Sequence, residues 1–113
     1  MIQIKRVYEE YAPSDGYRIL VDRLWPRGLT KDRAHVDEWA KDIAPSNELR
    51  QWFHHEQSNF AEFKTKYLQE LQGKKDLLTA IKKKAQHQRV TLVYGAKDET
   101  NNQAQVLLEL LKK

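Results

Sequence analysis

The residues best suited to chemistry gather at the end of one short apolar segment near the N-terminus. Asp22 and Arg23 follow this segment, and Arg27 lies in the Trp-Pro-Arg-Gly loop that comes next. Aspartate and arginine side chains are rarely buried unless they are paired. Two interpretations follow: an internal ion-pair network, or a site in which arginines bind an anionic ligand.

In the second interpretation, Arg23 and Arg27 would hold the anion, with help from Arg50. Arginine suits this role because its planar guanidinium group binds phosphates and carboxylates through paired hydrogen bonds. Arg27 favours a binding site, because its loop contains a proline and a glycine and therefore follows a constrained path. The ligand that we expect is an anionic, phosphate-bearing small molecule.

In the first interpretation, the arginines pair with Asp22 and Asp42 and only stabilise the fold. Structural networks also gather charged residues, so the clustering alone leaves both interpretations open. Arg18 favours the structural network, because it begins the apolar segment and would lie at the opposite end of the strand from Arg23.

Asp22 and His54 are the candidates for proton transfer, should the protein be an enzyme. We expect Arg23 to lower the pKa of Asp22, because a neighbouring cation stabilises the carboxylate. Histidine titrates near neutral pH, which would suit His54 as a proton donor close to Arg50. Alternatively, His54 simply follows a helix end and is stabilised by the helix dipole.

Trp25, Tyr94 and Asn102 complete the candidate binding site. Trp25 could stack on a ring, although packing in the core explains most tryptophans. Tyr94 ends a second apolar segment. Asn102 would lie at the start of the last helix, where backbone N–H groups favour an anion.

The chain contains no cysteine. This excludes a disulfide, a thiolate nucleophile and a cysteine-ligated zinc ion. His54 and His55 are adjacent and lack the His-Glu-x-x-His spacing, so we expect no metal site. Glycine-rich phosphate loops, nucleophile elbows and Walker lysines are also missing from the sequence, which argues against the common nucleotide hydrolases and leaves any cofactor unknown.

The net charge of +4 permits an anionic partner without requiring nucleic acid. Lysines at positions 74, 75 and 82–84 could bind nucleic acid, but no interleaved aromatic residues accompany them. We expect these lysines to form a solvated helix face. No apolar run approaches the roughly 18 residues that span a membrane, and no signal peptide is recognisable. With no cysteine, the chain fits a reducing, cytoplasmic setting.

The length of 113 residues predicts one domain, residues 1–113. Strands are predicted at residues 2–7, 18–22 and 90–94. Residues 36–43 fit either a strand or a helix, and we favour an extended segment because Pro45 ends it. Helices are expected after five capping residues: Thr30, Ser46, Ser58, Asp76 and Asp98.

Strands that alternate with helices predict an α/β fold with a small, mostly parallel sheet flanked by helices. Ligands of such sheets bind outside the carboxyl ends of the strands. Residues 22–23 and 94–95 follow two of these ends. We therefore expect the loop at residues 25–28 to lie near the first turn of the last helix.

The sequence resembles the YeaO-like bacterial family, a family of unknown function. The resemblance covers nearly the whole chain, and its most specific part is the string Asp-Arg-Leu-Trp-Pro-Arg-Gly at residues 22–28. Other segments that carry it are Asp15-Gly16-Tyr17-Arg18, Lys41-Asp42-Ile43-Ala44-Pro45-Ser46, Leu49-Arg50, Trp52-Phe53-His54, and Tyr94 with Ala96, Asp98 and Asn102. The resemblance implies a small cytoplasmic α/β protein, but no reaction, cofactor or catalytic residue.

Three hypotheses of function remain at this point. The leading one is a protein that binds an anionic small molecule at the strand ends and could be an enzyme. The second is a nucleic-acid-binding module that uses the lysine-rich helices. The third is a structural or adaptor protein without catalysis, whose arginine and aspartate residues only shape the core.

Overall fold

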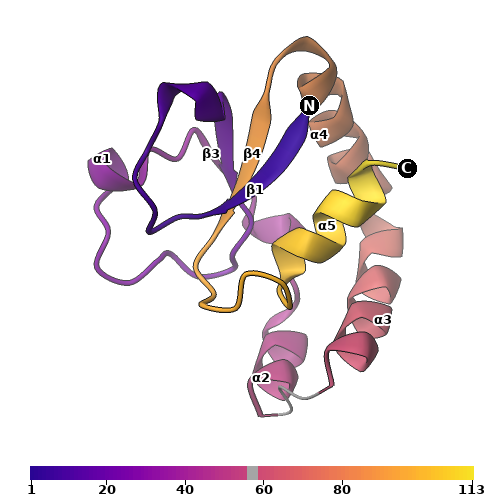
Figure 1. Ribbon diagram of the computed structural model, residues 1–113. Coiled ribbons are helices and arrows are strands. Elements are labelled where there is room, and N and C mark those ends of the chain that lie inside the picture. Colours follow the sequence, from indigo (N-terminus) through magenta and orange to yellow (C-terminus); the bar gives the residue numbers. More distant parts are fainter. Residues whose placement is uncertain (56–58) are drawn as a thin grey trace.

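The structure is a computed structural model that describes residues 1–55 and 59–113, without the side chains of residues 54 and 55. Its centre is a parallel sheet of four strands in the order β1-β4-β2-β3 (Figure 1). The strands are β1 (Ile2–Arg6), β2 (Tyr17–Leu20), β3 (Glu38–Trp39) and β4 (Val90–Tyr94). The predicted α/β fold with a small parallel sheet is confirmed.

β4 lies inside the sheet because all five of its residues are buried and none of them is charged. Ile19 of β2 and Ile4 of β1 both align with Leu92 of β4. A strand that is buried on both faces reads as a continuous apolar run, which is why this strand was predictable from the sequence. β3 has only two residues and pairs with β2 alone.

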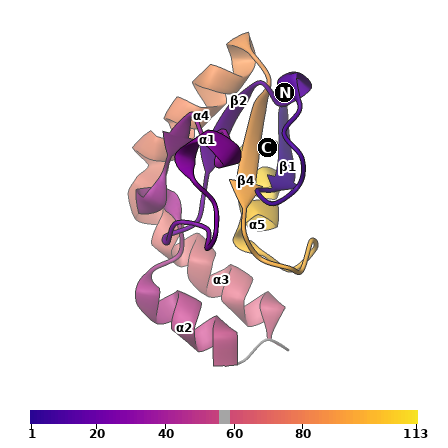
Figure 2. The same ribbon diagram turned by 90° about the vertical axis from the view of Figure 1, so that its left-hand side faces the viewer.

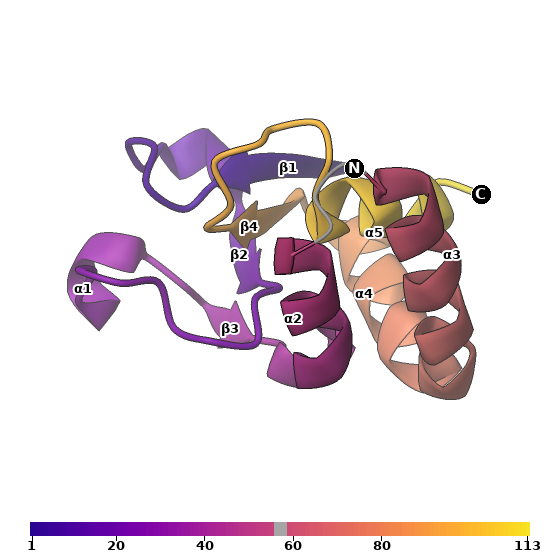
Figure 3. The same cartoon turned by 90° about the horizontal axis from the view of Figure 1, so that it is seen from below.

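The helices cover the two faces of the sheet unequally. They are α1 (Lys31–Ala34), α2 (Asn47–His55), α3 (Phe60–Leu71), α4 (Lys75–His87) and α5 (Gln103–Leu111). Figure 3 shows α3, α4 and α5 on one side of the sheet and the short α1 on the other. Short 3-10 helices at Pro13–Asp15, Lys41–Ile43 and Gln72–Lys74 link these elements.

The main core lies between the sheet and the helical layer. Side chains at alternate positions of β2 and β4 point into it, as the period of two in a strand requires. Ile19 and Leu92 pack there with Tyr67 of α3 and Leu107 of α5. A smaller core on the opposite face joins Val7, Leu20, Ala34 and Val93, with Trp25, Leu29 and Val36 packed against it.

Two predicted helix caps are confirmed. The side chain of Thr30 accepts a hydrogen bond from the backbone N–H of Arg33 at the start of α1. The Ser46 hydroxyl accepts one from the N–H of Leu49 at the start of α2. Ser58, predicted to cap the next helix, lies outside the described residues.

Two other predicted caps are wrong. α4 begins at Lys75, so Asp76 lies inside its first turn. α5 begins at Gln103 and is capped by Asn102, four residues beyond Asp98. Asp98 instead accepts hydrogen bonds from the backbone N–H groups of Thr100 and Asn101 and so stabilises the preceding loop.

Residues 36–43 contain the short strand β3 and a 3-10 helix, so the preferred extended segment is confirmed only for its middle.

α2 lies beyond the carboxyl ends of the strands, as Figures 1 and 2 both show. None of the helices in the described part of the chain is long and apolar enough to cross a membrane.

Candidate functional site

A cavity of about 690 Å³ opens at the carboxyl ends of β2 and β4. Its walls come from the loop that follows β2, the loop that follows β4, the helix α2 and Tyr8 beyond β1. Figure 3 looks onto this end of the sheet, with α2 in the foreground. The polar or charged lining side chains are Tyr8, Asp22, Arg23, Arg27, Arg50, Lys97, Asp98, Asn101, Asn102 and Gln103.

Asp22 connects three elements at the closed side of this cavity. Its Oδ2 accepts a hydrogen bond of 2.9 Å from the backbone N–H of Gly95, just after β4. Its Oδ1 accepts one of 2.5 Å from Nε2 of Gln103, the first residue of α5. A side chain at Gly95 would require this carboxylate to shift, because a Cβ atom there would lie 2.9 Å from Oδ2 of Asp22.

Burial raises the pKa of Asp22 to about 6, although the hydrogen bonds from Gly95 and Gln103 act in the opposite direction. The expectation that Arg23 would lower this pKa is therefore wrong. The physical reason is that the Arg23 guanidinium group points to other partners, so the carboxylate is desolvated without an adjacent cation.

Arg23 binds backbone carbonyl groups. Its Nε donates to the carbonyl oxygen of Pro45 at 2.9 Å, and its Nη2 donates to that of Ala44 at 3.2 Å. Within the described part of the chain it forms no ion pair, and the salt bridge considered with Asp42 does not form. Arg23 thus ties the end of β2 to the segment that leads into α2.

Arg27 and Arg50 line the cavity with exposed side chains. Neither guanidinium group pairs with a carboxylate among residues 1–55 and 59–113. The loop that carries Arg27 is held by Tyr8, whose hydroxyl donates to the Arg27 carbonyl oxygen at 2.9 Å. The structure therefore places two arginines in the lining of one cavity, and neither forms an ion pair with another described residue.

Trp25 and Asn102 line the same cavity, but both also have structural roles. The indole Nε1 of Trp25 donates to the carbonyl oxygen of Leu29 at 2.7 Å. The Trp25 ring lies edge-on against the Trp39 ring, with 5.3 Å between the two ring centroids. Asn102 is buried and caps α5 by accepting from the N–H of Gln105. Its Nδ2 donates to the carbonyl oxygen of Asp98.

Tyr94 does not line the cavity. It is 2% exposed and packs in the main core, on the helical side of the sheet. His54 belongs to α2, but its side chain lies outside the described residues, so its role in proton transfer stays a prediction. The described residues contain no cluster of three or more histidine, aspartate and glutamate side chains that could hold a metal ion.

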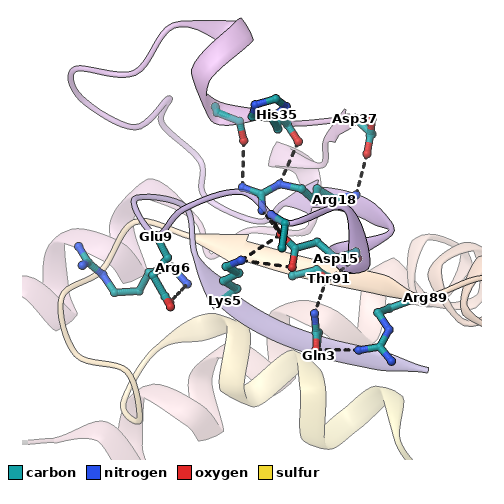
Figure 4. Close-up of polar contacts among 12 residues, drawn as sticks. Gln3, Lys5, Arg6, Glu9, Asp15, Arg18, His35, Asp37, Arg89 and Thr91 are labelled. Carbon is teal, nitrogen blue, oxygen red and sulfur yellow. Dashed lines mark hydrogen bonds and ion pairs between the residues drawn. The ribbon is translucent and has the colours of Figure 1, made fainter.

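Arg18 lies at the opposite end of the sheet, where Figure 4 shows it surrounded by polar partners. The guanidinium group is buried and pairs with Asp15 at 2.5 Å. It also donates to the carbonyl oxygens of Ala34 and His35, each at 3.0 Å. The predicted structural role of Arg18 is confirmed, but its partner is Asp15 and not Asp22 or Asp42.

Several residues of the cavity were missed from the sequence. Gln103 contacts Asp22 across 81 residues, and neither Tyr8 nor Lys97 belongs to the charged segment at residues 15–29. Phe53 and Phe63 also line the cavity, and both pack with the main core. Their position in the sequence could have indicated the polar residues, because Tyr8, Lys97 and Gln103 all follow the carboxyl end of a strand. No such position marks the two phenylalanines.

The family model described as the inactive DUF488-N3 subclade matches residues 1–113. The uncharacterised protein YeaO of Escherichia coli (strain K12) is 49% identical over 111 residues, which cover 98% of this chain and 96% of YeaO. The uncharacterised proteins Mb3100c of Mycobacterium bovis and MT3158 of Mycobacterium tuberculosis are each 42% identical over 110 residues, 97% of this chain and 92% of each relative. No solved structure matches the chain. The chain therefore belongs to the inactive DUF488-N3 subclade and is a YeaO-like protein.

Proposed function

We propose that this protein binds an anionic, phosphate-bearing small molecule in the cavity at the carboxyl ends of β2 and β4. The observation that carries the proposal is the position of Arg27 and Arg50, which line the cavity without a carboxylate partner among the described residues. Guanidinium groups that are not neutralised within a protein attract phosphate, and their paired donors fit its oxygens.

The size of the cavity supports a small molecule as the ligand. A volume of about 690 Å³ lies within the roughly 300–1,000 Å³ typical of small-molecule sites. Leu24, Trp25 and Phe53 add apolar surface to the lining, as such sites usually have. The position at the strand ends is also the one that parallel α/β sheets use for ligands.

Binding without catalysis is the form of the proposal that agrees with the family description, because the matching subclade is described as inactive. A carboxyl group with a pKa of about 6 would suit proton transfer near neutral pH. Asp22 nevertheless has a structural use, since it connects Gly95 and Gln103. We propose no reaction. We propose a cytoplasmic location, which the cysteine-free composition fits.

The nucleic-acid-binding alternative has less support. Several lysines of the helical layer already contact the protein itself: Lys64 pairs with Glu109 at 2.6 Å, and the ammonium group of Lys84 lies 4.0 Å from the centre of the Tyr17 ring. Lys74 donates to the backbone carbonyl of Asp42. A structural or adaptor role remains the outcome expected if no anion binds.

Thermal unfolding in the presence of anions tests the proposal. We expect inorganic phosphate and simple phosphate esters to raise the Tm of the wild-type protein, since a ligand at 100 times its Kd stabilises the folded state by about 2.7 kcal/mol. Arg27→Ala and Arg50→Ala should each reduce this increase. Arg33→Ala is the matched control, because Arg33 is exposed on α1 and does not line the cavity. If no anion raises the Tm, or if the control loses as much as the two test variants, the proposal is wrong.

A further inference from the structure

The cavity contains a feature that a simple phosphate site would not need. Asp22, which is half-buried, lies on the same lining as Arg27 and Arg50. An ionised carboxylate repels a phosphate, and removing it from water costs free energy unless its oxygens accept hydrogen bonds. The anion and this carboxylate must therefore occupy different parts of the cavity.

The hydrogen bonds of Asp22 show what is missing around it. An ionised carboxylate has about four acceptor positions on its two oxygens. Each oxygen accepts one hydrogen bond from the protein, from the N–H of Gly95 and from Nε2 of Gln103. Both donors are neutral. Asp22 forms no ion pair within residues 1–55 and 59–113, so each oxygen retains acceptor capacity on the cavity side.

Arg23, the arginine next to Asp22 in the sequence, does not form an ion pair with its carboxylate. Arg23 directs its guanidinium group to the carbonyl oxygens of Ala44 and Pro45 and so leaves the carboxylate without a cation. The lining thus combines arginines of the loop after β2 and of α2, and Lys97 of the loop after β4, with the Asp22 carboxylate, which contacts the start of the loop after β4 and the start of α5. Leu24, Trp25 and Phe53, which are not fully buried, offer apolar surface to the carbon skeleton of a ligand that reaches both the arginines and Asp22.

We infer that Asp22 is a specificity-determining residue of this cavity, which selects phosphate monoesters that carry a hydroxyl or amino group at the end remote from the phosphate. The phosphate binds Arg27 and Arg50, and the remote group donates a hydrogen bond to the free acceptor positions of Asp22. This inference rests on the proposed function and adds to it the class of ligand. Hydroxyl and ammonium groups share the required chemistry, and the experiment distinguishes them.

Alkyl phosphates of matched shape test this inference. Their chains contain two to five carbon atoms and end in a methyl, a hydroxyl or an ammonium group, so members of one length differ only in the donor. Affinities are measured by calorimetry at pH 8, above the pKa of Asp22 of about 6, so that the carboxylate is ionised. We expect at least one hydroxyl or ammonium ester to bind about ten- to one-hundredfold more tightly than its methyl counterpart, as one hydrogen bond to a charged group provides.

Asp22→Asn supplies the second measurement. The asparagine Oδ1 still accepts from the N–H of Gly95, and a rotated Gln103 amide presents its oxygen to the new Nδ2. We expect this variant to lose the preference for donor-bearing esters and to bind inorganic phosphate as tightly as the wild type or more tightly. Asp32→Asn is the matched control: Asp32 is exposed on α1 and does not line the cavity, so this variant should keep the preference.

The outcomes separate the two proposals. If inorganic phosphate and the methyl esters bind and Arg27→Ala weakens them, but the terminal group makes no difference at any chain length, only the role of Asp22 is overturned. The same holds if Asp22→Asn retains the preference. If no phosphate compound binds the wild-type protein, both proposals fall. A preference confined to the ammonium esters identifies an aminoalkyl phosphate, and one shared with the hydroxyl esters identifies a phosphorylated alcohol.

Discussion

At the scale of single residues, the candidate site contains a carboxylate that is withdrawn from water and forms no ion pair with another described residue. Asp22 has a folded-state pKa of about 6 against an ordinary value of 3.8. The folded protein therefore binds a proton more tightly than the unfolded chain does. The contribution of this group to stability is complete below about pH 4 and is lost as the pH rises through 6.

This titration predicts a measurable difference between the wild type and Asp22→Asn. Because a difference of one pKa unit corresponds to 1.36 kcal/mol, the wild type should lose about 2 to 3 kcal/mol relative to the variant between pH 4 and pH 7. Urea unfolding at several pH values measures it. The other carboxylates titrate in both proteins and cancel in the comparison. A difference in unfolding free energy that stays constant, or that grows in favour of the wild type as the pH rises, would contradict the raised pKa.

At the scale of elements, the segment before α2 determines where Arg50 and Phe53 lie. Arg23, which follows β2, attaches this segment to the sheet by donating a hydrogen bond to the carbonyl oxygen of Pro45. On the other side, the Tyr67 hydroxyl of α3 donates to the carbonyl oxygen of Ile43 at 2.6 Å. Ser46 then caps α2, because its hydroxyl accepts a hydrogen bond from the backbone N–H of Leu49. The same hydroxyl donates to the carboxylate of Glu70 in α3 at 2.6 Å. A helix that forms one wall of the cavity is thus attached to both neighbouring layers.

Ser46→Ala should lower the free energy of unfolding by about 1 to 2 kcal/mol, because it removes the cap of α2 and one hydrogen bond of Glu70. Ser46→Thr keeps the hydroxyl and is the matched control, with a smaller loss expected. Denaturant unfolding measures both. We also expect the alanine variant to bind phosphate more weakly, since the start of α2 is no longer fixed. Equal losses for alanine and threonine would show that the hydroxyl has no such role.

The elements also show which features the sequence could predict. β4 and its parallel pairing were predictable because an uncharged run of five buried residues has few other uses. β3 was predictable only as part of a longer extended segment at residues 36–43, because Glu38 and Trp39 form a strand only where β2 offers a partner. Asp98 and Asn102 are both good capping residues four positions apart, and local preference does not choose between them. The loop contacts of Asp98 decide the choice.

The site was predictable in place but not in detail. The rule that ligands bind at the carboxyl ends of parallel strands located the cavity from residues 22–28. The same rule did not reveal where each side chain points. Arg23 and Arg27 are four residues apart, yet the first binds backbone carbonyl groups and the second is exposed in the cavity. Contacts across the fold make this difference, and they involve residues far away in the sequence.

At the scale of the whole molecule, the charged residues gather at the two ends of the sheet, in a buried ion-pair network at one end and in the cavity lining at the other. At the end opposite the cavity, Asp15 accepts hydrogen bonds from Arg18 and Lys5, and its backbone oxygen accepts one from the Thr91 hydroxyl (Figure 4). Asp15 is 3% exposed and Arg18 is 1% exposed. These groups join β1, β2 and β4 with the loop before β3, so their effect extends over the sheet and does not reach the cavity lining.

Arg18→Met should therefore be among the most destabilising single substitutions in the chain. It leaves Asp15 buried with Lys5 as its remaining cation and leaves the carbonyl oxygens of Ala34 and His35 without their donor. Breaking a buried ion pair from one side typically costs about 3 to 5 kcal/mol, against a total stability of about 5 to 15 kcal/mol for a domain. Urea unfolding measures the loss. Asp15→Asn combined with Arg18→Met should recover part of it, because the uncompensated charge is then removed.

Phosphate binding by the folded fraction should be unchanged in both variants, because neither residue lines the cavity. An Arg18→Met protein that unfolds at the wild-type urea concentration, or one that stays folded but loses phosphate binding, would show that the two ends of the sheet are not separate in this way.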